Sequence, residues 1–221
     1  MARTNFCVTL SIMTVPQEIE IKFLVPDLKS LEQELTTRGF RCVTASTHEV
    51  NTLYDLPGQK LRRKGELLRL RKYGETWRLT HKARARPGKH KSRAELETGV
   101  SAGLQMDEML RALGYRPVFI YEKYRSEWSD DAGHVVLDHT PIGDIAEIEG
   151  SPRWIDRTAA SLGVTLASYI TKSYAELFFE WKRKYKRKAR NMTFRECGGR
   201  AKSRSISARK SSAEAEAGSG V

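Results

Sequence analysis

The sequence predicts an α+β protein whose antiparallel sheet is strongly curved or closed into a barrel. Seven or eight candidate strands follow one another along the chain, and most intervals are too short for the crossover helices of a parallel sheet. Helical patterns occur near each end of the chain and once in the middle. With 221 residues, the chain fits one domain with terminal extensions. A barrel of about eight strands can enclose one small ligand.

The expected elements of the first half are short strands separated by turns. A strand at 17–25 precedes Asp27, a candidate N-cap for a helix that has a leucine-lined side. Gly39 is the expected end of that helix. The next elements, in order, are an extended segment at 40–54, a loop at 55–64, two strands at 66–72 and 76–82, a basic loop at 83–91 and a strand at 92–100.

The second half contains a hairpin and ends in helices. Helical spacing begins near residue 104 and stops before Gly114. Turn residues at 130–133 predict the hairpin. The expected elements, in order, are a helix at 104–113, hairpin strands at 118–128 and 135–138, a strand at 144–149 and helices at 152–162 and 168–181.

The formal net charge of +12 is concentrated beyond residue 181. That segment holds thirteen of the 39 Lys and Arg residues but only three of the 27 acidic ones. A segment of this composition cannot bury enough apolar surface to fold alone. We therefore expect a disordered N-terminal extension at 1–15, a folded domain at 16–181 and a basic, disordered tail at 182–221. The tail is a candidate for weak contact with RNA, DNA or anionic lipid, although no interleaved aromatic pattern marks a nucleic-acid module.

The remaining composition favours a cytoplasmic protein. No apolar run approaches the ~20 residues that cross a bilayer. The apolar patch at 6–13 is too short and too mixed for a signal peptide, and Met13 is an alternative to Met1 as the natural start. The three cysteines show neither disulfide nor metal-binding spacing, which fits a reducing compartment.

Charged residues recur at every second position in several candidate strands. Side chains two apart in a strand point to the same side, so Glu18, Glu20 and Lys22 share one face. For a single strand, a half-exposed surface position explains this pattern. The alternation returns, with both signs of charge, in further segments: Arg69/Arg71, Arg78/Thr80/Lys82, Arg93/Glu95/Glu97, Lys123/Arg125, Val136/Asp138 and Glu147/Glu149.

These charged faces are predicted to converge on the concave side of the sheet, because the helices can cover the opposite, apolar faces. A solvent-facing surface of ion pairs explains one strand better than the whole set, since exposed pairs contribute little stability and need not recur in this order. Buried charges require partners or ligands. Carboxylates hold hard divalent cations, whereas Arg and Lys hold extended polyanions. Together they predict a metal-assisted site for a polyphosphate.

The same residues resemble, in order, the motifs of the CYTH superfamily, the triphosphate tunnel metalloenzymes. Glu18-Ile19-Glu20-Ile21-Lys22 is similar to the ExExK motif of that family. Further matching segments lie at 68–71 (LRxR), 79–82 (TxK), 93–97 (RxExE), 122–125 (EKxR), 137–138 (LD), 143–149 (GxFxEIE, with isoleucine where an aromatic residue is common) and 172–174. The resemblance covers roughly residues 16–181, and the ordered set is far more specific than ExExK alone.

The resemblance implies an eight-stranded antiparallel tunnel, with helices packed outside, that holds a triphosphate and Mg²⁺ or Mn²⁺. The implied triphosphate contacts are Lys22, Arg69, Arg71, Lys82, Lys123, Arg125 and Lys172. The implied metal ligands are Glu18, Glu20, Asp138, Glu147 and Glu149, and all of them except Asp138 would serve catalysis through the metal. Arg93, Glu95 and Glu97 are left open between a role in the site and a structural ion-pair network.

Within the superfamily, the run at 113–117 ahead of 122–125 most resembles the class IV adenylyl cyclases. That resemblance favours cyclisation of ATP to cyclic AMP and pyrophosphate. Hydrolysis of inorganic, nucleoside or thiamine triphosphate uses the same parts and stays open. A non-catalytic polyphosphate or nucleotide binder is a further alternative, although a pure anion binder would not need the full set of acids. A homodimer is also an expectation of the family. The sequence decides neither the reaction nor between Mg²⁺ and Mn²⁺.

Overall fold

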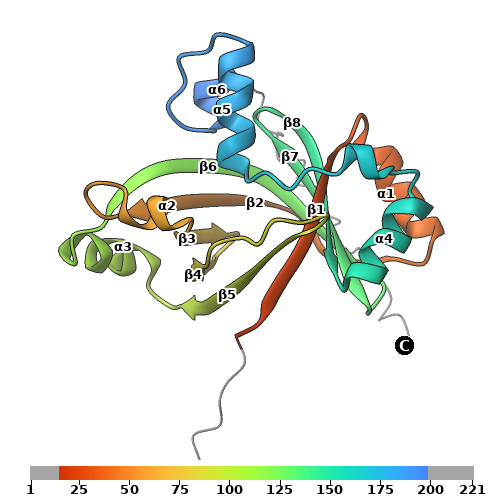
Figure 1. Ribbon diagram of the computed structural model, residues 1–221, viewed down its shortest axis with the longest axis horizontal. Helices are drawn as coiled ribbons and strands as arrows, with labels where there is room; N and C mark the ends of the chain where they lie inside the picture. Colours follow the sequence, from red (N-terminus) through yellow and green to blue (C-terminus); the bar gives the residue numbers. More distant parts are fainter. Residues whose placement is uncertain (1–14, 199–221) are drawn as a thin grey trace, which may run out of the picture.

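The computed structural model describes residues 15–198, which form a closed antiparallel barrel of eight strands with helices outside it (Figure 1). The strands are β1 (Gln17–Leu24), β2 (Arg41–Asp55), β3 (Leu67–Tyr73), β4 (Thr76–Lys82), β5 (Lys91–Val100), β6 (Arg116–Ser129), β7 (Gly133–Thr140) and β8 (Gly143–Gly150). Around the barrel they run in the order β1, β5, β4, β3, β2, β6, β7, β8, and β8 pairs with β1. The predicted fold class is confirmed.

The long strands β2 and β6 pair with an irregular register. These strands have 15 and 14 residues, and their register shifts near Cys42, near Thr44 and near Leu53. Irregularities of this kind bend a strand and increase its twist. A sheet that bends in this way can close on itself, and closure leaves no exposed strand edge.

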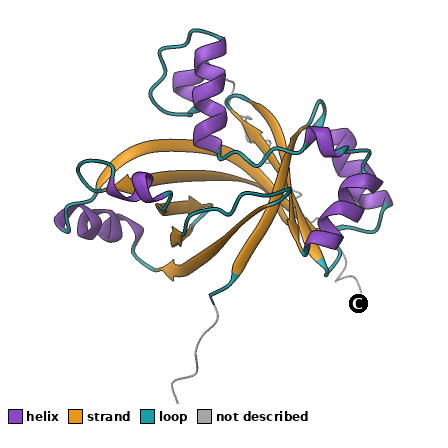
Figure 2. Ribbon diagram, in the orientation of Figure 1, coloured by secondary structure: helices purple, strands orange, loops and turns teal. Residues whose placement is uncertain are grey.

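Two helices cover the outer face of β1 and β8. They are α1 (Leu28–Thr37) and α4 (Pro152–Ser161), which lie together at the right of Figure 2. The carboxylate of Asp27 accepts the backbone N–H of Lys29, so Asp27 caps α1 as predicted. Ile21 and Ile148 point outward into the same apolar core as Trp154 of α4. Because these faces are covered by helices, the alternate charged residues of β1 and β8 face the barrel interior.

The other helices lie around the barrel. They are α2 (Lys60–Lys64), α3 (Gly103–Ala112), the 3-10 helix η1 (Leu166–Ser168), α5 (Tyr174–Lys184) and α6 (Phe194–Cys197). The sequence predicted only a loop where α2 forms. The carboxylate of Asp55 explains the difference, because it accepts the backbone N–H groups of Leu61 and Arg62 in α2.

The helix expected at 168–181 begins later, at Tyr174. Ser173 and Glu176 form a reciprocal capping box that fixes this start. The chain just before it is extended, and Ile170 exchanges both backbone hydrogen bonds with Lys22 of β1. The backbone of the segment is therefore paired with β1 and cannot continue as a helix.

The expected boundary between a folded domain at 16–181 and a disordered tail at 182–221 needs correction. Residue 181 lies inside α5, and the chain continues in a folded segment, residues 182–198, which we call the C-terminal clasp. The backbone of Met192 bonds to that of Ile120 and Glu122 in β6. Met192 and Phe194 are buried there, although the surrounding sequence is strongly basic. The composition of the segment does not indicate that these two apolar residues are buried against the barrel. Residues 1–14 and 199–221 lie outside the described part of the chain.

Two further observations concern thiols and membranes. Cys42 is exposed and Cys197 is buried, and both are free thiols. Between residues 15 and 198, none of the helices is long and apolar enough to cross a membrane.

Candidate functional site

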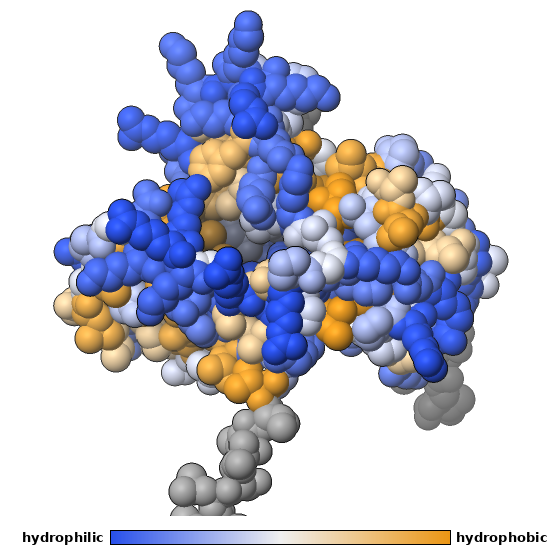
Figure 3. Space-filling view, viewed as in Figure 1, coloured by the Kyte–Doolittle hydropathy of each residue, from blue (hydrophilic) through white to orange (hydrophobic). Residues whose placement is uncertain are grey.

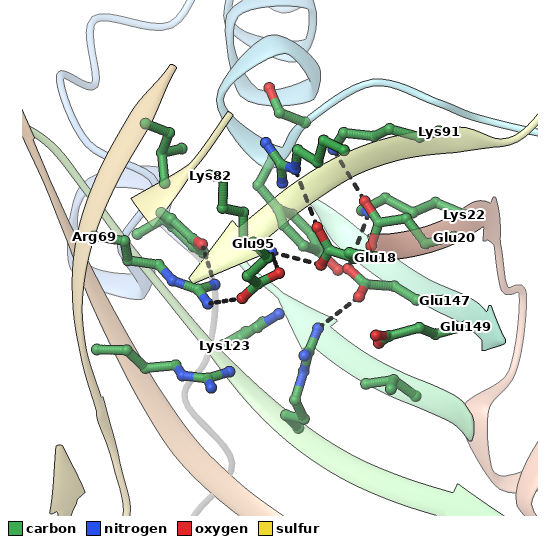
Figure 4. Close-up of a pocket in the computed structure, with 18 of the residues that line it drawn as sticks. Glu18, Glu20, Lys22, Arg69, Lys82, Lys91, Glu95, Lys123, Glu147 and Glu149 are labelled. Carbon is green, nitrogen blue, oxygen red and sulfur yellow. Dashed lines mark hydrogen bonds and ion pairs between the residues drawn. The ribbon is translucent and has the colours of Figure 1, made fainter. Parts of the chain in front are cut away.

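The barrel encloses a cavity of about 360 Å³ whose lining is dominated by charged side chains (Figure 4). The alternation of side chains along the strands brings these residues inside. Seven acidic residues line it: Glu18, Glu20, Glu95, Glu97, Glu127, Glu147 and Glu149. Eight basic residues line it: Lys22, Arg69, Arg71, Lys82, Lys91, Arg93, Lys123 and Arg125. Opposite charges therefore nearly balance within one enclosed space.

Four carboxylates gather on the wall formed by β1 and β8. The antiparallel register sets Glu20 opposite Glu149 and Lys22 opposite Glu147, and Glu18 follows on the same face of β1. Burial, together with the neighbouring charges of Glu18, Glu20 and Glu147, raises the pKa of Glu149 to about 7. Glu149 therefore holds a proton more tightly than an exposed glutamate does.

Three of these carboxylates are ion-paired. Lys22 Nζ lies 2.7 Å from Glu20 Oε1 and 3.3 Å from Glu147 Oε1, and Lys91 Nζ lies 3.0 Å from Glu20 Oε1. Glu18 accepts hydrogen bonds from Lys82 Nζ of β4 and from an arginine of β5. Burial by itself raises the pKa of Glu18, but Lys82 and its other basic neighbours hold that pKa well below its usual range.

Asp138, expected as a metal ligand, has a different position in the structure. It is fully buried beneath the cavity lining. Its carboxylate accepts hydrogen bonds from Lys123 Nζ at 2.9 Å, from Arg125 Nε at 2.8 Å and from the hydroxyl of Tyr174. Lys123 Nζ also lies 4.4 Å from the centroid of the Tyr174 ring. Asp138 thus fixes the orientation of two predicted phosphate contacts, and its oxygens have no direct access to the cavity.

The three residues left open on β5 lie in the cavity and form an ion-pair network across strands. Glu97 pairs with Arg71 at 3.1 Å and with Arg69 at 3.5 Å. Glu95 pairs with Lys82 at 2.8 Å, and Arg93 pairs with a carboxylate of β1. The Nε atoms of Arg69 and Arg71 are nevertheless buried without a hydrogen-bond acceptor among residues 15–198. An anion in the cavity would supply acceptors for such donors.

Lys172 is not brought into the cavity. Its ammonium group lies 2.6 Å from Glu180 Oε1, and its side chain is half exposed. The other predicted phosphate contacts, from Lys22 to Arg125, all line the cavity. The capping box at Ser173 starts α5 immediately after Lys172. The side chain of Tyr174, and not that of Lys172, therefore lines the cavity.

The structure also adds residues that the sequence analysis did not include. Lys91 was assigned to the loop at 83–91 but is the first residue of β5 and binds Glu20. Glu49 is completely buried beside Lys123 and Arg71. Glu49 and Asn51 are two positions apart in β2, so the strand period places them on one face. This face could have been recognised as polar, but only one of the two residues is charged.

The donor set fits a hard divalent cation, but the carboxylates do not already surround one. Within residues 15–198, no three acidic, histidine or cysteine side chains converge on a common point. Glu18, Glu20 and Glu147 instead bind lysine or arginine, as the preceding ion pairs show. Carboxylate oxygens are the ligands that Mg²⁺ and Mn²⁺ prefer. Burial and three neighbouring carboxylates raise the pKa of Glu149 to about 7, so a cation beside it would relieve their repulsion.

The fold has counterparts among known proteins. A family model of the CYTH domain matches residues 16–174. An adenylate cyclase candidate from Vibrio parahaemolyticus has a TM-score of 0.66 at 20% identity, over 75% of this chain and 99% of that chain. The PH1012 protein of Pyrococcus horikoshii gives 0.63 at 23% identity, over 72% and 98%. An adenylyl cyclase candidate from Hippeastrum with a dominant triphosphatase activity gives 0.56 at 16% identity, over 74% and 95%. No protein of curated description matches the chain.

Proposed function

Because the chain belongs to the CYTH domain family, we propose that it is a divalent-metal-dependent enzyme that acts on a triphosphate inside the barrel. The observation that carries this proposal is the cavity lining, in which eight bases and seven acids face one enclosed space. A triphosphate needs many positive groups along its length. A divalent cation needs carboxylate oxygens beside them.

The basic residues bind the phosphates in this proposal. Lys22, Arg69, Arg71, Lys82, Lys123 and Arg125 are the contacts carried over from the sequence, and Lys91 joins them because it faces the same cavity. In the structure, these bases form ion pairs with the carboxylates opposite them. When a triphosphate takes over Lys22 and Lys82, Glu20 and Glu18 each lose one of their two basic partners. The released carboxylate oxygens are then free to accept a cation.

The cation would be held by Glu18, Glu20, Glu147 and Glu149. Glu149 is the most informative of the four, since burial and three neighbouring carboxylates raise its pKa. Asp138 is not included, because its oxygens already accept hydrogen bonds from a lysine, an arginine and a tyrosine. When bound, Mg²⁺ or Mn²⁺ would neutralise phosphate charge and polarise the phosphoryl oxygens.

Cyclisation of ATP to cyclic AMP and pyrophosphate is the first reaction to test, because the sequence around 113–125 resembles the class IV adenylyl cyclases. Hydrolysis of a triphosphate is the second candidate, and a specific observation favours it. The two tyrosines of the lining, Tyr121 and Tyr174, stack on each other at 5.7 Å. Stacked in this way, they are not arranged as a platform for a base, and hydrolysis requires only the phosphate contacts.

Product analysis tests both reactions. The full chain is incubated with ATP or inorganic triphosphate and Mg²⁺ or Mn²⁺, and the products are separated by ion-exchange chromatography. Cyclic AMP with pyrophosphate supports the cyclase, whereas ADP with phosphate, or turnover of inorganic triphosphate alone, supports the hydrolase. Binding of triphosphates without turnover of any of them would sink the enzyme proposal and leave a non-catalytic binder.

Variants of the metal-binding wall test the assignment of residues. Glu20→Ala and Glu147→Ala should each lower the metal-dependent rate by more than about 100-fold, because each removes a proposed ligand. Glu108→Gln, in the exposed part of α3, removes one negative charge away from the cavity and is the matched control. Circular dichroism verifies that each variant is folded. Near-wild-type rates for both alanine variants would refute the ligand assignment.

A further inference from the structure

The C-terminal clasp carries a dense positive charge that the cavity does not use. Residues 182–198 contain eight Lys and Arg residues and a single acidic residue, Glu196. Seven of the eight basic residues are exposed. The two carboxylates closest to them in sequence are engaged elsewhere, because Glu180 pairs with Lys172 and Glu196 accepts the backbone N–H groups of Arg190 and Asn191. Figure 3 shows hydrophilic side chains projecting from the region where Figure 1 places α5 and α6.

The clasp is held rigidly against the barrel. Met192 is completely buried and forms a backbone bridge with β6. Asn191 Oδ1 accepts the backbone N–H of Ile120, and Glu122 Oε1 accepts the backbone N–H of Phe194. The basic side chains are therefore displayed on an ordered surface. Holding many like charges close together costs electrostatic free energy, which an anionic partner recovers.

Aromatic side chains lie among these bases, which corrects the expectation that no aromatic pattern interleaves with them. Phe179 and Tyr185 are 44% and 53% exposed, although most large aromatic residues of the core are covered. Lys184 Nζ lies 5.3 Å from the Tyr185 ring, and Arg187 lies 6.0 Å from the Trp181 ring. Bases that track a phosphate backbone beside aromatic rings on which nucleobases stack are the features of single-stranded nucleic-acid sites.

We propose that the C-terminal clasp, with the adjoining part of α5, binds single-stranded nucleic acid; the Lys and Arg residues of the clasp contact the phosphates, and Phe179 and Tyr185 lie against the bases. An anionic membrane fits the surface less well. A helix that inserts into a membrane interface needs a free apolar face. The apolar face of α5 is already used, since Phe178 is completely buried and packs against Phe119 of β6.

Fluorescence anisotropy with a labelled single-stranded uridine 20-mer tests the proposal on the full chain at several salt concentrations. Lys186→Glu/Arg187→Glu/Lys188→Glu should weaken binding about tenfold or more and reduce the slope of log affinity against log salt by about 2. The matched control is Lys29→Glu/Arg153→Glu/Arg157→Glu, which reverses three exposed charges on α1 and α4 and should bind within about twofold of wild type. Turnover of triphosphate should be unchanged in both variants.

The aromatic contribution is tested separately. Phe179→Ala and Tyr185→Ala should each weaken binding about fivefold or more without changing the salt slope, as expected for lost stacking. Equal losses in the two charge-reversal variants would overturn the proposal, because binding would then follow net charge alone. No loss in either aromatic variant would overturn the contact with bases. Flotation with vesicles containing phosphatidylserine, without binding of the 20-mer, would assign the clasp to membranes and also refute it.

Discussion

Replacing Glu149 by glutamine should stabilise the metal-free protein at alkaline pH and have no such effect at acidic pH. Burial and the adjacent carboxylates raise the pKa of Glu149 from 4.5 to about 7. The folded protein therefore binds a proton more tightly at this position than the unfolded chain does. The contribution of Glu149 to stability falls as the pH rises from 4.5 to about 7 and is constant above that range.

The size of the effect follows from that difference. At about 1.4 kcal/mol for each pH unit, ionising Glu149 in the fold costs about 3 kcal/mol above pH 7. Glutamine has nearly the same shape and carries no charge, so Glu149→Gln should recover most of this free energy. For a protein of this size, the melting temperature should rise by roughly 6–12 °C at pH 8.

Thermal unfolding of wild type and Glu149→Gln, followed by circular dichroism in the presence of a chelator, measures this difference between about pH 4.5 and pH 8. Glu108→Gln, an exposed carboxyl on α3, is the control and should change the melting temperature little at any pH. A gain in Glu149→Gln that is the same at both pH values would show that its cause is packing. No gain at pH 8 would refute the interpretation that burial and the three neighbouring carboxylates disfavour the charged form of Glu149.

Three further predictions concern the buried pairs, the outer packing and the cavity bases. Asp138→Asn should lower the free energy of unfolding in urea by about 3 kcal/mol or more, since it leaves a buried lysine and arginine without their shared partner; a loss below about 1 kcal/mol would contradict this. Gly103→Ala should cost about 1–3 kcal/mol, because a Cβ there would lie 1.9 Å from the indole ring of a β4 tryptophan, whereas Gly99→Ala meets nothing within 4 Å and serves as its control. Lys91→Ala should lower kcat/KM about 10- to 100-fold, because it removes a charged phosphate contact. Lys172 lies outside the cavity, so Lys172→Ala should keep kcat/KM within about twofold of wild type. A larger loss in Lys172→Ala than in Lys91→Ala would refute the placement of both residues.

Much of the site could be predicted because a strand has a period of two. Glu18, Glu20 and Lys22 alternate with apolar residues, and this local pattern fixes a common face before any tertiary contact forms. The same reasoning placed Arg69 and Arg71 on one face of β3. It failed for Lys91, because the end of the preceding loop cannot be distinguished from the start of β5 without its pairing partner in β1.

Other differences arose where a long-range contact outweighed the local pattern. Composition favoured disorder from residue 182 onward, but Met192 and Phe194 find buried positions against β6. Asp138 has the residue type and the strand position of a metal ligand. Only the approach of Tyr174 from α5, with Lys123 and Arg125, shows that its oxygens are already used.

By itself, the sequence determined that charged and apolar faces alternate along antiparallel strands, and therefore that a charged concave surface backed by helices is formed. Strand periodicity is a property of the local backbone, so it can be recognised without the fold. Only the tertiary structure decided which charges meet. Closure of the barrel sets Glu149 beside three other carboxylates, the start of α5 leaves Lys172 outside with Glu180, and burial of Met192 orders the basic clasp on β6. Those outcomes depend on register and on residues distant in the chain, and the free energy of a charge is set by the neighbours that it meets.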